Sequence, residues 1–207
     1  MMETALAKSR REEYSETTRA ALIEAAGELF LKEGYQQAGV QAIARSARVT
    51  RGAFYHHFAD KPAIFEALVI QLQAAAAMRV RDKAETGKDA WQRLAFSIEA
   101  FLDICSEPAY RRLVIEAAPA VLGSARSHQI EDDHALGGMI KAMIELKRRG
   151  ELNVGDPWLA GRMIARMVCE AALLLSASDE PAKLRRNAIG IVERTLSAFR
   201  TDDAMAP

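Results

Sequence analysis

The residues best suited to chemistry lie in a short stretch around position 55. Arg51, Tyr55 and His56 would share one face of a helix, because residues four and five positions apart point in similar directions. A guanidinium, a phenol and an imidazole can form hydrogen bonds with base edges and phosphates in a DNA groove. Gly52, on the same face, would let the backbone approach closely. The stretch therefore predicts contact with double-stranded DNA.

The positive charge is local, because the chain carries 28 Lys and Arg against 28 Asp and Glu and has a formal net charge of zero. Arg45, Arg48 and Lys61 surround the face described above, against the single acid Asp60. The same cations could form an ordinary solvated surface, and composition alone does not separate the two interpretations. The spacing of the whole stretch from Gly34 to Lys61 favours DNA binding.

Two short helices are predicted to position this face, over Val40–Ala47 and from Thr50 to about His57. Their apolar residues are Ile43, Ala44, Ala47, Val49, Phe54 and Phe58. These residues would form a small core that holds the two helices at a steep angle, as a helix-turn-helix requires.

Apolar residues at helical spacing extend through the rest of the chain and predict an all-α fold of about nine helices. Residues 1–14 are charged and aperiodic and indicate a flexible arm, and Gly34 is placed to end the first helix. Asp60 can cap a long helix that runs to about Lys83. Later helices are expected over 90–106, from 108, over 124–149, 158–176 and 180–200. No strand pattern, repeat or low-complexity tract is present in the sequence.

Other kinds of chemistry lack support in the sequence. His128 and Asp132 have metal-ligand spacing, but no third ligand accompanies them, so no metal, cofactor or enzyme activity is predicted. No apolar run approaches the length of a membrane span, about 18 residues, and no signal peptide is apparent, which favours the cytoplasm. Cys105 and Cys169 are expected to be buried free thiols, with a disulfide as the alternative.

The stretch from Thr18 to Leu68 resembles the DNA-binding domain of the TetR family. The residues at the family's separations are Gly34-Tyr35, Ile43-Ala44, Val49-Thr50, Gly52, Tyr55-His56-His57-Phe58 and Asp60-Lys61. The resemblance implies that Arg51, Tyr55 and His56 face DNA, and that Thr50 and Lys61 hold phosphates. Two residues depart from the family pattern. Arg48 stands at a turn position where Gly is usual, which predicts either a strained backbone or an altered turn, and Gly39 replaces the usual Ser or Thr cap.

With this resemblance, the expected domains are an N-terminal helix-turn-helix over 15–60 and an effector-binding and dimerisation domain over 61–207. The second domain is similar to the family only loosely. Its last two helices are broadly apolar and would pair with those of a second copy in a homodimer, unless they form the core of a monomer. A repressor of palindromic operator DNA is favoured over an activator, because occluding a promoter needs no polymerase contact. The alternative function is a helical sensor or protein-interaction dimer without DNA binding.

Regulation by a small, largely apolar effector is expected in a cavity between the helices over 90–106, 124–149 and 158–176. The candidate lining residues are Trp91, Phe96, Phe101, His134, Met139, Met143 and Met163. Each of them could instead belong to a plain hydrophobic core.

Overall fold

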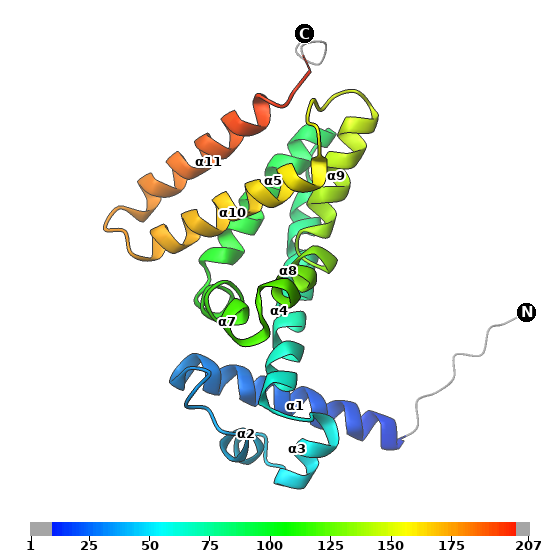
Figure 1. Cartoon of the computed structure of the whole chain (residues 1–207), viewed down its shortest axis with the longest axis vertical. Coiled ribbons are helices and arrows are strands. Elements are labelled where there is room, and N and C mark those ends of the chain that lie inside the picture. The colour runs from blue at the N-terminus through cyan, green and yellow to red at the C-terminus, as the bar shows by residue number, and fades with distance from the viewer. Residues whose placement is uncertain (1–9, 202–207) are drawn as a thin grey trace, which may run out of the picture. The chain divides into compact units, whose positions relative to one another are not determined.

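The computed structural model describes residues 10–201 and confirms the all-α prediction (Figure 1). Within these residues, β structure is limited to an isolated bridge between Leu152 and Arg200. The described residues form two compact units that divide between Val69 and Ile70. The domain boundary expected at residue 60 stays a prediction.

The first unit contains α1 (Arg10–Glu33), α2 (Val40–Ser46), α3 (Arg51–His57) and the beginning of α4 (Lys61–Ala84). The expectation of an arm over 1–14 is wrong from Arg10 onward, because α1 already begins there; residues 1–9 lie outside the described residues. The early turns of α1 form although Tyr14 is 81% exposed. Helix α1 ends as predicted at Gly34, whose φ of 82° suits a residue without a Cβ.

Three aromatic rings join the end of α1 to the start of α4. Phe65 packs edge-on against Phe30 and Tyr35, with ring centroids 5.4 and 5.0 Å apart. Phe30 and Phe65 are almost completely buried. Helix α4 has the length and mean hydropathy of a membrane span. Its apolar sequence nevertheless contains the charged Glu66, and the helix supplies core residues to both units. Its length and hydropathy are therefore weak evidence that it spans a membrane.

The second unit contains the end of α4 and all later elements. These are α5 (Ala90–Ser106), α6 (Pro108–Tyr110), the π-helical η1 (Arg111–Ala117), α7 (Ala118–Leu122), α8 (Ser124–Asp133), α9 (Gly137–Arg148), α10 (Pro157–Ser176) and α11 (Pro181–Ser197). Asp89 and Asp156 cap α5 and α10 through their carboxylates. The prediction of one helix over 124–149 is wrong, because the chain breaks between α8 and α9.

The core of the second unit lies among α4, α5, α9 and α10. Cys105 and Cys169 are buried there as free thiols, which confirms the prediction. Two buried polar side chains of this unit have partners: Tyr110 donates a hydrogen bond to Gln73 Oε1 at 2.9 Å, and Glu131 pairs with the partly exposed Arg166. These partners satisfy groups that would otherwise be costly to bury.

Candidate functional site

The turn between α2 and α3 is built by backbone hydrogen bonds that close the end of α2. The N–H of Val49 donates to Ala44 O at 3.0 Å, and that of Arg48 donates to Arg45 O at 3.0 Å. This pattern is a Schellman motif, which requires a left-handed residue in the position of Arg48. Arg48 has a φ of 57°, the only positive φ of a non-glycine among the described residues. Of the two alternatives for the missing glycine, the structure has the left-handed residue and not an altered turn.

Helix α3 is fixed at its start by Thr50 and on its inner side by phenylalanines. The side-chain oxygen of Thr50 accepts a hydrogen bond from the N–H of Ala53 at 3.1 Å. Phe54 is completely buried and Phe58 nearly so. Arg19 of α1 covers the ring of Phe58 at 5.1 Å from its centroid. The small core predicted for the two short helices is therefore present.

The outer side of α3 presents Arg51, Tyr55 and His56 together, all of them exposed. Arg51 Nη2 donates to the hydroxyl of Tyr55 at 3.3 Å, and its guanidinium lies 5.5 Å from the centre of that ring. This contact keeps the guanidinium in an exposed position and leaves most of its N–H donors available. Gly52 has no side chain, so nothing projects from the helix surface beside Arg51. A Cβ at this position would have only Thr50 Oγ1 near it, at 3.7 Å.

The positive charge on and beside this face comes from three exposed arginines, Arg45, Arg48 and Arg51. His57, on the inner side of α3, does not add to it. Partial burial lowers the pKa of His57, and electrostatic repulsion from the neighbouring His56 and Arg19 lowers this pKa further. His57 is accordingly neutral at pH 7.

Lys61 is placed differently from the other cations. Its Nζ donates to the carbonyl oxygens of Tyr35 and Gln36 at 2.9 and 3.2 Å, and lies 4.5 Å from the centroid of the Tyr35 ring. Two of its three N–H groups are thus used inside the protein and one is left for a phosphate. Asp60 Oδ1 accepts from the N–H of Ala63 at 2.8 Å and caps α4 as predicted.

The candidate effector residues do not converge on one cavity. Phe101 and Met143 are buried in the core, whereas Met163 is 61% exposed on α10. The rings of Trp91 and Phe96 lie beneath Arg200 and Lys83, at 4.9 and 5.0 Å from the cations. Only His134 and Met139 line a shared cavity, which lies between α4, α5 and α9.

This α4–α5–α9 cavity differs from the expected one because α10 contributes none of its lining residues. Sequence reasoning missed its polar members Arg81, Arg93 and Ser97. A sequence signal existed, since Arg93 and Ser97 are four residues apart and therefore lie on one face of α5.

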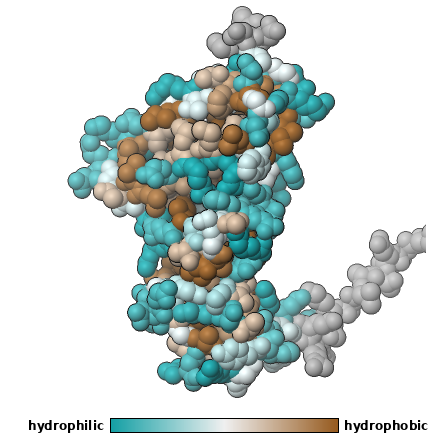
Figure 2. All heavy atoms as spheres, viewed as in Figure 1, coloured by the Kyte–Doolittle hydropathy of each residue, from teal (hydrophilic) through white to brown (hydrophobic). Residues whose placement is uncertain are grey.

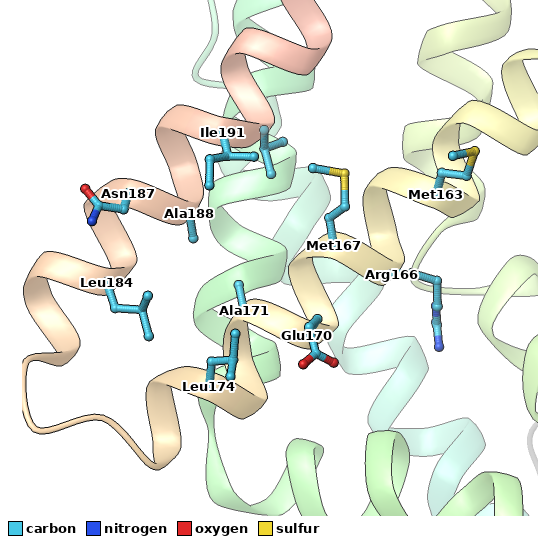
Figure 3. A pocket seen from close by; sticks show the side chains of 11 residues that line it. Met163, Arg166, Met167, Glu170, Ala171, Leu174, Leu184, Asn187, Ala188 and Ile191 are labelled. Atoms are coloured by element: carbon cyan, nitrogen blue, oxygen red, sulfur yellow. The ribbon is translucent and has the colours of Figure 1, made fainter.

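A second hollow separates α10 from α11 and has a volume of about 660 Å³. Figure 3 shows Leu184, Ala188 and Ile191 of α11 directed toward Met167, Ala171 and Leu174 of α10. Figure 2 shows hydrophobic surface over these two helices. Met163, Leu174 and Ile191 are all about half exposed or more, so apolar surface remains uncovered in the single protomer.

One of the two residues weighed as metal ligands has another partner. Asp132 forms an ion pair with Arg162 across α8 and α10. Among the described residues, no group of three His, Cys, Asp or Glu side chains is arranged to hold a metal ion.

Two family models match the chain and together span both units. The model described as bacterial regulatory proteins, tetR family, matches residues 22–68. The model described as tetracyclin repressor-like, C-terminal domain, matches residues 91–199, which is more than half of the 207-residue chain. The first of these ranges contains the exposed face of α3, and the second contains the hollow between α10 and α11.

Individual relatives agree with these models. The HTH-type transcriptional regulator UidR of Escherichia coli is 25% identical over 178 residues, which cover 84% of this chain and 87% of UidR. A TetR-family regulator from Pectobacterium atrosepticum is 28% identical, with a TM-score of 0.73 over 94% of this chain and 99% of that one. SmeT, the repressor of a Stenotrophomonas maltophilia multidrug efflux pump, is 25% identical, with a TM-score of 0.66 over 93% and 95% of the two chains. SmeT also matches as a triclosan complex, with a TM-score of 0.67.

Proposed function

The chain belongs to the TetR family of DNA-binding transcriptional regulators, and on that basis we propose that it is a homodimeric repressor released by a small molecule. Its family consists of regulators and not of enzymes. It would act in the cytoplasm, on palindromic operator DNA. The observation that best supports DNA binding is the exposed pair of Arg51 and Tyr55 on a capped α3, beside the exposed Arg45 and Arg48.

Arg51 is the residue we assign to base recognition. Its guanidinium is exposed and can form paired hydrogen bonds with a guanine, the commonest specific contact in a major groove. Gly52 allows the backbone of α3 to approach the DNA, and His56 lies one residue beyond Tyr55 on the same face. Arg45, Arg48, Thr50 and Lys61 would instead position the unit against phosphates.

Dimerisation is supported by the uncovered apolar surface of α10 and α11. A second copy would bury Met163, Leu174 and Ile191, which water otherwise contacts. A two-fold dimer presents two copies of α3, so the operator should be palindromic, with half-sites about 34–36 Å apart. An interface well above about 1,000 Å² in total would be needed for a stable dimer.

Release by an effector is supported by the α4–α5–α9 cavity and, in a related fold, by the complex of SmeT with triclosan. Helix α4 contributes residues both to the first unit and to this cavity, so it can link the two. An effector that prefers a dimer unable to fit the operator lowers DNA affinity through linkage. A coupling of about 1–3 kcal/mol gives a 5- to 150-fold loss of affinity.

Selection of bound sequences from random DNA, followed by fluorescence anisotropy, tests DNA binding. We expect an enriched palindrome, affinity that falls steeply with salt, and a loss of about 1–3 kcal/mol with relaxed specificity in Arg51→Ala. The matched control is Arg148→Ala, which removes an exposed arginine from the second unit and should leave affinity unchanged. If no sequence is enriched at low salt, the alternative of a sensor or protein-interaction dimer replaces this proposal. A promoter reporter distinguishes repression from activation.

A further inference from the structure

The α4–α5–α9 cavity has a volume of about 370 Å³, at the lower end of the range for ligand pockets, about 300–1,000 Å³. Much of its wall is small or apolar. These residues include Ala77, Val80, Ala84, Ala135, Met139 and Ala142. Such a wall favours a small hydrocarbon chain or ring.

The remaining wall is polar and contains two guanidinium groups. Arg81 comes from α4 and Arg93 from α5, while Ser97 and His134 complete the polar set. No Asp or Glu occurs among the residues that line the cavity within the described part of the chain. The cavity therefore combines an apolar body with positive charge that no acid in its own lining compensates.

The two arginines lie at the same end of the cavity. Helices α4 and α5 are joined by the short loop over 85–89, so the end of one helix lies near the start of the other. Arg81 is three residues before the last residue of α4, and Arg93 is three residues after the first residue of α5. Both residues therefore lie near the loop end of the cavity, where their side chains are within reach of one ligand group.

Arg93 is held in place for this role and keeps donors available. Its Nε donates to the carbonyl oxygen of Gly87 at 3.0 Å, which leaves its two Nη groups for a ligand. Arg81 lies 3.6 Å from Asp82, but both side chains are more than half exposed, so this ion pair is weak. An oxyanion can compete for Arg81 because it would also contact Arg93.

Ser97 lies one helical turn after Arg93 on α5, and this polar group does not demand a charged partner. The hydroxyl of the buried Ser97 already donates to Leu94 O at 2.7 Å. A ligand can therefore present an anionic head to the loop end and an apolar tail to the rest of the cavity.

From this arrangement we propose that the effector is a small organic carboxylate, with its oxygens between Arg81 and Arg93 and its hydrocarbon part against Val80 and Met139. This inference rests on the proposed regulation by a small molecule and names the chemistry of the ligand. A planar carboxylate matches the two-pronged donor geometry of a guanidinium.

A matched series of eight-carbon ligands tests the charge of the head group on the full chain. Octanoate, 1-octanol, octylamine and octyl phosphate share a tail, and their affinities are measured by calorimetry and thermal shift without DNA. We expect octanoate to bind at least about tenfold more tightly than the alcohol and the amine. The proposal is overturned if the alcohol or the amine binds as well as octanoate, or if no member binds at millimolar concentration. Tighter binding of octyl phosphate also overturns it, in favour of a phosphate ester.

Variants assign the binding to the two arginines. The double variant Arg81→Gln with Arg93→Gln should bind octanoate at least about tenfold more weakly than the native chain does. Its affinity for octanol should be unchanged. The control Arg148→Gln with Lys141→Gln removes the same charge from exposed positions of α9 outside the cavity lining and should have no effect. Equal octanoate affinity in the double variant and the native chain would refute the assignment.

The ligand proposal and the regulator proposal can fail separately. Ligand affinity is measured without DNA, and operator affinity is measured without ligand. Octanoate binding that leaves operator affinity unchanged would retain the site but contradict its role as the effector site. Absence of ligand binding, with intact operator binding, would reject the carboxylate and retain the DNA-binding regulator.

Discussion

The ammonium of Lys61 donates a hydrogen bond to the carbonyl oxygen of Tyr35 at 2.9 Å while lying over the ring of the same residue. It also donates to Gln36 O at 3.2 Å. The first residue of α4 thereby fixes the turn that follows α1. Burial raises the pKa of Tyr35, and the negative charge of Asp60 raises this pKa further, so the phenol stays neutral beside the lysine.

The two contacts of Lys61 predict a variant that is defective in both stability and DNA binding. Lys61→Met should lower the free energy of unfolding by about 1 kcal/mol, because two carbonyls lose a charged donor. It should also weaken binding to all DNA sequences alike. The slope of log affinity against log salt concentration should become shallower by about 0.9, the effect of one phosphate contact. Urea denaturation and anisotropy measure the two effects. The control is Lys32→Met, which removes an exposed lysine near the end of α1. If Lys61→Met is as stable as this control, the two contacts of Lys61 contribute nothing to stability.

A pair of substitutions at Arg48 separates its charge from its backbone strain. A left-handed conformation costs a residue with a Cβ about 1–2 kcal/mol, which glycine avoids. Because Arg48 has a φ of 57°, Arg48→Gly should be more stable than Arg48→Ala by about 1 kcal/mol. Both variants lose the same charge, so their operator affinities should fall equally. Equal stabilities in thermal denaturation would contradict the effect of strain.

Local signals were sufficient for the ends of the helices around the DNA-binding face. Thr50 and Asp60 cap α3 and α4, and Gly34 ends α1, because each acts through atoms within a few residues in the chain. The beginning of α1 was missed because its early residues carry no apolar stripe. Thr17 and Thr18 instead bond to carbonyls four residues earlier, within an exposed helix.

The effector residues required tertiary information, whereas the break between α8 and α9 did not. Gly137 and Gly138 were a signal for the break that was not used. Hydrophobicity could not separate Met143, which is fully buried, from Met163, which is 61% exposed, because both fit a helical apolar stripe. The Arg93–Ser97 spacing indicates only part of the polar rim of the α4–α5–α9 cavity, because His134 joins it from a part of the chain that is distant in sequence.

The two cysteines should be inert in the folded protein. Cys105 and Cys169 are 0% and 5% exposed. Burial raises the pKa of Cys105 well above its usual value, and the neighbouring Cys169 raises this pKa further, so the reactive thiolate is scarce even at pH 8. A thiol reagent should therefore label both residues only as urea unfolds the chain. Rapid labelling without urea would contradict this, and Cys105→Ser would then identify the reacting thiol.

The final prediction concerns the uncovered face of α10 and α11. Val192 of α11 is only 5% exposed, so a charge there would unfold the protomer itself. Ile191 is 49% exposed and lines the hollow between the two helices. Ile191→Glu should therefore leave the protomer folded and oppose the pairing of two copies, because each would bury an unpaired carboxylate.

Ile144 on α9 provides a control with the same side chain and the same exposure, 49%, outside the lining of that hollow. Sedimentation at micromolar concentration should give a dimer for the native chain and for Ile144→Glu, and a monomer for Ile191→Glu. Operator affinity should fall with the dimer, because one copy of α3 then binds without the second. Helical circular dichroism should be unchanged in both variants. A native chain that sediments as a monomer, or an Ile191→Glu variant that remains a dimer, would place the interface elsewhere or remove it.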